Sequence, residues 1–141
     1  MYLLDTNICV YAINGRYPSV SRYLLRIPPD HIFLSSITIG ELEYGAAKSR
    51  WGDKTRQIMH AFLANFRVLD FTEQDTVLFG QLRASLTSLS TPIGAYDVMI
   101  AAQSISRHLT VVTHNTGEFS RVPGISLEDW VSDEPVQKEL Q

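Results

Sequence analysis

Residues 1–7, MYLLDTN, form a short apolar run, Met1 to Leu4, that ends at an acid, Asp5. An apolar run of this length followed at once by polar side chains is typical of a buried strand that presents a carboxylate at its carboxyl end. The next segment, Asn7 to Ile13, is expected to be a helix. A buried strand followed directly by a helix favours a parallel sheet that is covered by helices.

The same alternation of strands and helices continues along the chain. We expect further strands at His31–Leu34, Val68–Phe71, Leu109–Thr113 and Ile125–Leu127, and helices at Ser19–Arg26, Thr38–Arg50, Asp53–Phe66, Glu73–Leu89 and Ile93–Ser106. This order predicts a single-domain α/β/α sandwich around a mostly parallel sheet. The domain should span residues 1–131, with Trp130 closing the core, and residues 132–141 should form a solvated polar tail.

Two of the expected helices are adjacent, and their apolar faces follow from residues spaced three and four apart. These faces comprise Ile39, Leu42, Ala46 and Ala47 in the first helix, and Ile58, Phe62 and Phe66 in the second. The sequence therefore predicts two adjacent helices.

The composition limits the class of protein. With 141 residues, of which 45% are hydrophobic, the chain is long enough for one core and too short for two. Its only cysteine, Cys9, cannot form an internal disulfide, so nothing in the sequence requires an oxidising compartment. Residues Met1 to Asp5 lack the features of a signal peptide, and no apolar stretch is long enough to span a bilayer. We therefore expect a soluble cytoplasmic protein with no membrane partner.

Four acids stand near the expected carboxyl ends of strands or near the start of a helix, where open parallel sheets bind ligands: Asp5, Glu41, Asp97 and Glu118. Taken alone, each has an ordinary explanation as a helix cap, a first-turn acid favoured by the helix dipole, or a solvated loop residue. Asp97 is the most unusual, because apolar residues surround it and a buried charge is costly unless it is paired or bound to an ion. Together, the four would repel one another unless a cation neutralised them.

Mg²⁺ or Mn²⁺ is the cation that this set favours, because these ions take oxygen ligands and keep several waters. Zinc would favour histidine or cysteine ligands, and the four histidines show no metal-ligand spacing. The net charge of −3 argues against a general nucleic-acid-binding protein. Counting the four acids as neutralised turns −3 into +1, and nine of the twelve basic residues are arginine, which suits contacts to phosphate. The charge therefore permits RNA binding without indicating it.

Four motifs, taken together, resemble the PIN-domain family. They are Asp5-Thr6-Asn7; Ser36-Ile37-Thr38 leading to Glu41-Leu42 and Tyr44-Gly45; Pro92 to Asp97 with Ile100-Ala101; and Val112-Thr113 to Glu118-Phe119 followed by Val122-Pro123-Gly124. The resemblance spans Met1 to Trp130 and is greatest to the VapC toxins, which are ribonucleases of bacterial type II toxin–antitoxin systems. Single motifs are loose, but the set in this order and spacing is specific.

The resemblance implies an endoribonuclease that depends on Mg²⁺ or Mn²⁺, an antitoxin of the VapB kind that blocks it, and a homodimer. It matches the family's three principal acids to Asp5, Glu41 and Asp97. Many PIN domains have an aspartate at the position of Asn115, whereas in the subgroup that this chain resembles the glutamate matching Glu118 takes that role. Transfer RNA is a frequent target in the family, so we expect transfer RNA to be the substrate.

The hypothesis is in-line attack of a metal-activated water on an RNA phosphodiester. The expected catalytic and metal-binding residues are Asp5, Glu41, Asp97 and Glu118, and the expected supporting residues are Thr6, Asn7, Thr113 and Asn115. Three alternatives remain: an aspartyl phosphatase, which usually has a second aspartate where this chain has Asn7; an RNA-processing nuclease that is not a toxin; and a catalytically silent binding module. The choice between one metal ion and two, and among transfer, ribosomal and messenger RNA, also remains open.

Overall fold

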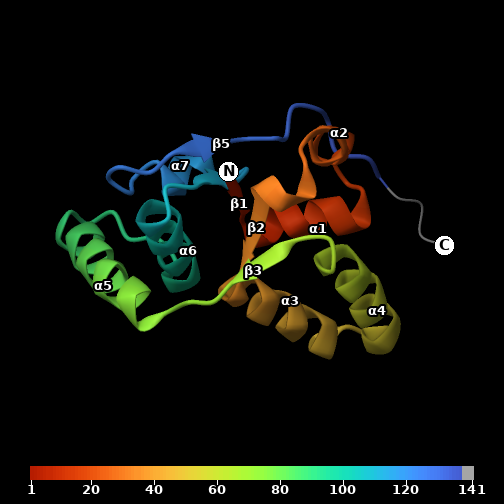
Figure 1. The fold of residues 1–141 in the computed structure, drawn as a ribbon, viewed down its shortest axis with the longest axis horizontal. Coiled ribbons are helices and arrows are strands. Elements are labelled where there is room, and N and C mark those ends of the chain that lie inside the picture. Colours follow the sequence, from red (N-terminus) through yellow and green to blue (C-terminus); the bar gives the residue numbers. More distant parts are fainter. Residues whose placement is uncertain (138–141) are drawn as a thin grey trace.

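The sheet of this protein has five parallel strands in the order β3-β2-β1-β4-β5 (Figure 1). A computed structural model describes residues 1–137. The strands are β1 (Tyr2–Leu4), β2 (Ile32–Ser35), β3 (Arg67–Leu69), β4 (Thr110–Val112) and β5 (Leu127–Glu128). Because every neighbouring pair is parallel, the carboxyl ends of all five strands lie at one edge. The chain builds outward from β1 to β3 and then places β4 on the other side of β1, so β1 and β4 form the topological switch point at which such sheets bind ligands.

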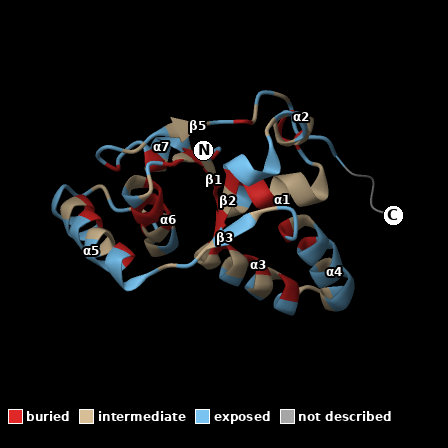
Figure 2. Cartoon of the chain, in the orientation of Figure 1, coloured by how far each residue is buried: buried red, intermediate tan, exposed pale blue. Residues whose placement is uncertain are grey.

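Helices cover both faces of the sheet. They are α1 (Thr6–Asn14), α2 (Pro18–Arg26), α3 (Ser36–Lys48), α4 (Gly52–Leu63), α5 (Glu73–Ser88), α6 (Ala95–Ser106) and α7 (Thr116–Phe119), with a short 3₁₀ helix, η1 (Pro29–His31). Buried side chains of α1 to α4 form one apolar core, and those of α5 to α7 form a second core. The two cores make a three-layer α/β/α sandwich, as the sequence predicts, with buried residues concentrated between the layers (Figure 2).

The alternation of side chains along the strands explains the two cores. In β1, Leu4 belongs to the core beneath α1 to α4, whereas Leu3 belongs to the core beneath α5 to α7. Val112 and Val111 divide in the same way in β4. Each fully buried side chain of this size contributes about 1.5–3 kcal/mol, so the central strands gain stability from both faces. Trp130 is fully buried, with its ring stacked on Tyr23, and the prediction that it closes the core is confirmed.

Three sequence predictions are corrected in detail. The third strand is Arg67–Leu69 and ends before Phe71. Neither η1 nor α7 was expected, because segments of three or four residues are too short to show a helical period. In α4, Met59 and Leu63 are buried and Ile58 is 49% exposed, whereas Phe62 and Phe66 of the predicted face are partly buried against the same core. Ala47 in α3 is exposed.

The first part of the expected tail lies against the domain. Asp133 accepts hydrogen bonds from the backbone and the hydroxyl of Ser19 at 2.9 and 2.8 Å, and it pairs with Arg22. The backbone N–H of Val136 donates to the carbonyl of Arg16 at 2.7 Å. The stretch is therefore anchored by Asp133 at the start of α2, while Ser132 and residues 134–137 are exposed to solvent. Residues 138–141 lie outside the described residues.

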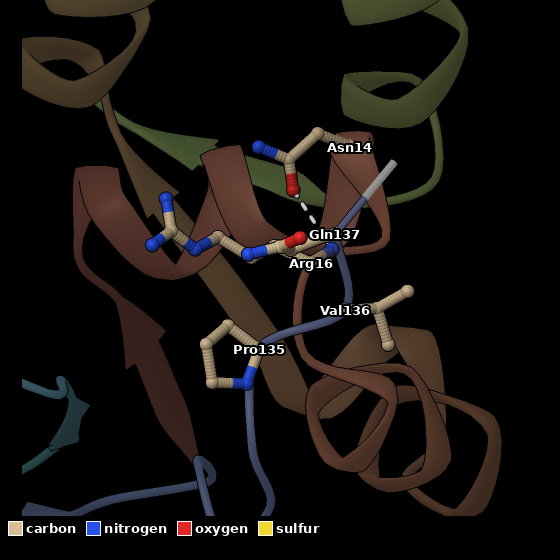
Figure 3. Close-up of a pocket in the computed structure, with 5 residues that line it drawn as sticks. All are labelled: Asn14, Arg16, Pro135, Val136 and Gln137. Atoms are coloured by element: carbon tan, nitrogen blue, oxygen red, sulfur yellow. Dashed lines mark hydrogen bonds between the residues drawn. The ribbon is translucent and has the colours of Figure 1, made fainter. Parts of the chain in front are cut away.

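A pocket of about 450 Å³ opens where this segment crosses the end of α1 (Figure 3). It is lined by Asn14, Arg16 and residues 135–137. Asn14 is the last residue of α1, whereas Asp5 caps the first turn, so the pocket lies a helix length from the candidate acids. Arg16 is its one ionisable lining residue, which makes it a poor site for acid chemistry. Within residues 1–137, no helix is long and apolar enough to cross a membrane.

Candidate active site

Asp5 lies at the carboxyl end of β1, at the switch point of the sheet. Its Oδ1 accepts a hydrogen bond from the backbone N–H of Ile8 at 2.9 Å, so it also caps α1, and the residue is only 4% exposed. Burial raises the pKa of Asp5 to about 6, hydrogen bonds from Thr113 and Ile8 oppose the rise, and the charges of Glu41 and Asp129 add to it. Asp5 is thus a helix cap, as its ordinary explanation holds. Burial and the neighbouring acids also make ionisation of its carboxyl unfavourable.

Asp97 is the third residue of α6, whose first turn points at the same edge of the sheet. The helix behind it is almost entirely buried, from Val98 to Ser104, as its apolar sequence predicts. Burial, followed by the charges of the other three acids, raises the pKa of Asp97 to about 6. Because Asp5, Glu41 and Glu118 all act on this one carboxyl, the structure brings the four predicted acids together from four separate elements.

Glu41 extends from α3 toward Asp5 and is held by a neighbouring hydroxyl. Thr6 donates to Glu41 Oε1 at 2.7 Å and lies 3.2 Å from the buried hydroxyl of Thr38. Ser35 caps α3 by accepting from the backbone of Ile37, which fixes the start of the helix beside β1. Thr38 was not predicted as a site residue; its position one turn before Glu41 on the same helix face could have indicated it.

Glu118 is fixed by its own loop. Asn115 donates from its side chain to Glu118 Oε2 at 2.9 Å, and its backbone N–H donates to the hydroxyl of Thr113 at 2.9 Å. The fully buried Phe119 anchors the short helix α7 that carries Glu118. Asn115 and Glu118 therefore act together, with the amide orienting the carboxylate.

Two residues complete the description of the site. Asn7, predicted as a supporting residue, is exposed, and no hydrogen bond within the described residues joins it to the acids. Asp129, which was not predicted from the sequence, directly follows β5. Its charge contributes to the raised pKa of Asp5, and its Oδ2 is hydrogen-bonded to His114 Nδ1 at 2.9 Å. The expected last strand, Ile125–Leu127, ends one residue before the observed one, so the sequence does not place Asp129 directly after a strand.

Two clefts flank Glu41. One, of about 280 Å³, is an apolar groove among α1, α3 and α4, lined among others by Val10, Gly45 and Ala46. The other, of about 520 Å³, lies between the starts of α3 and α6. Glu41 lines both, so anything bound in either cleft would adjoin the acids.

The donor set suits a hard divalent cation. Within residues 1–137, no group of three or more histidine, cysteine or acidic side chains is arranged to hold a metal ion directly. Mg²⁺, however, is usually held by one or two carboxylates and several waters, so a tight cage is not required. The raised pKa values of Asp5 and Asp97 come partly from mutual repulsion, which a cation would relieve. The residues therefore fit Mg²⁺ or Mn²⁺.

Comparisons with known proteins agree with this geometry. Residues 2–125 match the family described as PIN domain. The chain is 41% identical over 129 residues to a tRNA(fMet)-specific endonuclease VapC from Salmonella typhimurium, covering 92% of this chain and 97% of that protein. It is 38% identical to a ribonuclease VapC2 from Rickettsia felis, covering 92% and 98%.

Solved structures give the same result. The VapBC2 complex from Rickettsia felis, bound to a DNA fragment from its promoter, contains a chain with a TM-score of 0.86 and 38% identity, with 92% of this chain and 98% of that chain covered. A DNA-bound VapBC complex from Salmonella typhimurium contains a chain with a TM-score of 0.86 and 40% identity, with 92% and 97% covered. Both are complexes of the VapBC kind.

Proposed function

The chain belongs to the PIN-domain family, and from this premise we propose that it is a Mg²⁺- or Mn²⁺-dependent endoribonuclease that acts as the toxin of a toxin–antitoxin pair. The observation that carries the proposal is the convergence of Asp5, Glu41 and Glu118 on Asp97 at the switch point of the sheet. Transfer RNA is the proposed substrate, supported by the name of the Salmonella typhimurium relative. A homodimer and a cytoplasmic location stay predictions.

The proposed mechanism assigns a role to each side chain. Asp5 and Asp97 would hold the cation, which would supply charge neutralisation at the scissile phosphate and lower the pKa of the attacking water. Thr6 occupies one oxygen of Glu41, and the other oxygen would orient the attacking water or hold a second ion. Asn115 fixes Glu118 for the same purpose or for a second ion. The hydrogen bond from Thr113 opposes the rise that burial causes in the pKa of Asp5.

We expect RNA cleavage by the purified protein to require added Mg²⁺ or Mn²⁺, because the site offers only oxygen ligands. The measurement is cleavage of total transfer RNA after dialysis against EDTA, with and without each ion restored. Zn²⁺ at the same concentration serves as the control, and it should restore little activity since its preferred ligands are absent. Cleavage that persists unchanged in EDTA would refute the metal requirement.

The apolar groove beside Glu41 is the proposed binding site of the antitoxin. A partner segment whose apolar face lies along α1, α3 and α4 would reach the acids, where a basic side chain of that segment would pair with Glu41. The relatives solved as VapBC complexes support a partner of the VapB kind. A segment in this groove would block RNA without any change in the acids themselves.

Gly45→Leu is expected to keep the toxicity of the protein and to remove its inhibition by the antitoxin. A Cβ at Gly45 would meet no atom within 4 Å, so we expect leucine to extend into the groove and to leave α3 in place. The variant should still arrest bacterial growth when expressed, but a co-expressed antitoxin from the neighbouring reading frame should no longer restore growth. Gly80→Leu, at an equally open position in α5, should behave like the parent. Normal growth with the parent expressed in soluble form would count against the toxin function. If the antitoxin fully restores growth of cells that express Gly45→Leu, the groove is not the antitoxin site.

A further inference from the structure

The second cleft beside Glu41 carries two exposed aromatic rings, and we refer to it as the tyrosine cleft. It is lined by Ser36, Ile37, Gly40, Glu41, Tyr44 and Tyr96. Tyr44 is 67% exposed and Tyr96 is 58% exposed, so both rings are open to solvent. The volume of about 520 Å³ lies within the usual range for a small-molecule site.

The two tyrosines stand next to the acids. Tyr96 immediately precedes Asp97 at the start of α6, and Tyr44 follows Glu41 by three residues in α3, on the neighbouring helix face. Each aromatic ring is therefore carried by a helix that also carries an acid of the site. A group bound between the rings would be joined to whatever lies at the acids by only a short connection.

The surface of the tyrosine cleft suits a flat, partly polar ring. The phenol rings offer faces for stacking, and a side chain at Gly40 would meet no atom within 4 Å, so the wall of the cleft is open there. The Ser36 hydroxyl accepts from the backbone of Phe71, which leaves its own proton to donate. Lys48 Nζ lies 4.9 Å from the centre of the Tyr44 ring and places a positive charge beside the cleft.

We propose that the tyrosine cleft binds one nucleobase of single-stranded RNA, next to the phosphate that is cut, with Tyr44 and Tyr96 as its stacking surfaces and Lys48 contacting a neighbouring phosphate. This assignment rests on the proposed function. Stacking on aromatic side chains is the general way in which proteins hold unpaired bases. It would also supply affinity at a site whose acids repel the RNA backbone.

A second copy of this chain is the other occupant to consider. Sealing the cleft with a protein surface would bury Glu41, which lines it, and a buried carboxylate without a cationic partner is costly. A nucleobase avoids this cost, because its amino groups can donate hydrogen bonds to the carboxylate and because the cleft remains open to water. The lining therefore favours a base over a dimer contact.

The test compares Tyr44→Ala and Tyr96→Ala with Tyr44→Phe and Tyr96→Phe. Each alanine variant should raise the KM for an RNA substrate, and weaken binding of a non-cleavable oligoribonucleotide, by about tenfold, since loss of one stacked ring has an effect of this order. The kcat should change much less. The phenylalanine variants keep the ring and should resemble the parent. Trp51→Ala removes an exposed aromatic ring that does not line the cleft, and it should leave KM unchanged.

The outcomes separate this inference from the proposed function. If the parent does not cut RNA, the proposed function fails and the assignment fails with it. If the parent cuts RNA but both alanine variants keep the parental KM and oligonucleotide affinity, only the base-binding assignment is overturned. If the alanine variants change the mass of the protein in solution, measured by analytical ultracentrifugation, the rings belong to a contact between copies, and the assignment is again overturned.

Discussion

An Asp97→Asn variant is expected to cut RNA roughly 100-fold or more slowly than the parent, because loss even of a group that only supports a metal ligand costs about 10–100-fold. Asparagine keeps the shape of the side chain and removes its charge, so the packing of α6 from Val98 to Ser104 should be retained. In the absence of metal, the variant should be at least as stable as the parent. The repulsion that Asp5, Glu41 and Glu118 exert on Asp97 disappears with the charge.

The stability difference should depend on pH in a defined direction. Burial and neighbouring charges raise the pKa of Asp97 to about 6 in the folded protein, whereas an aspartate in an unfolded chain titrates near 4. The ionised carboxyl therefore destabilises the metal-free parent above about pH 6, and protonation removes this penalty as the pH falls toward 4. The advantage of Asp97→Asn should be present at pH 7.5 and should shrink by pH 5.

The measurement is thermal unfolding in EDTA at both pH values beside a cleavage assay in Mn²⁺. Asp30→Asn is the matched control, since Asp30 is exposed in η1 at the opposite end of β2 and should affect neither property. An Asp97→Asn protein that melts well below the parent yet still cuts RNA would show that Asp97 is structural. The proposed active site would then have to be abandoned.

The fold was largely predictable because the central strands are buried on both faces. Runs such as Met1 to Leu4 and Leu109 to Thr113 are apolar or β-branched throughout, and each matches a strand in the interior of the sheet. The edge strand β3 was placed less well, because it is partly exposed and Val68 at its centre packs little. Helix existence followed from apolar periodicity. The burial of Met59 and Leu63 did not, because Ile58, Phe62 and Phe66 form an equally regular apolar stripe, of which only Ile58 is exposed.

The site was predictable to the extent that its residues follow strands or break an apolar pattern. Asp5 and Asp97 were found in these two ways. Hydrogen bonds such as those from Thr6 to Glu41 and from Asn115 to Glu118 join separate segments or depend on a loop conformation, so their geometry could not be read from spacing. Asp129 was missed because β5 is only two residues long, and a strand this short has no clear end in a sequence.

The other large effect concerns stability and arises far from the acids, where α5 and α6 are joined. Asp75 is a buried carboxylate in the first turn of α5, with 2% of its side chain exposed, and Arg107 at the end of α6 donates to both of its oxygens at 2.8 and 2.9 Å. Ser106 donates to the same carboxylate, and Thr72 forms a capping box with it. Burial alone would raise the pKa of Asp75, but the hydrogen bonds from Arg107, Thr72 and Ser106 outweigh burial and lower the pKa to about 2.

Arg107→Ala is therefore expected to destabilise the protein by about 3 kcal/mol and to lower its Tm by roughly 10 °C, because it leaves a buried carboxylate without its cation. The value is at the low end for a buried pair, since the Arg107 side chain is 26% exposed and water can reach the gap. The pair stabilises the fold above the ordinary pKa of aspartate and is lost as the pH falls from 4 toward 2, so parent and variant should converge in stability at acid pH. Urea unfolding at pH 7 and pH 3 measures both effects. The control is Arg83→Ala, because Arg83 is an exposed arginine of α5, and this variant should lose less than about 1 kcal/mol of stability at either pH. An Arg107→Ala protein as stable as this control would show that the pair adds nothing to the packing of α5 on α6.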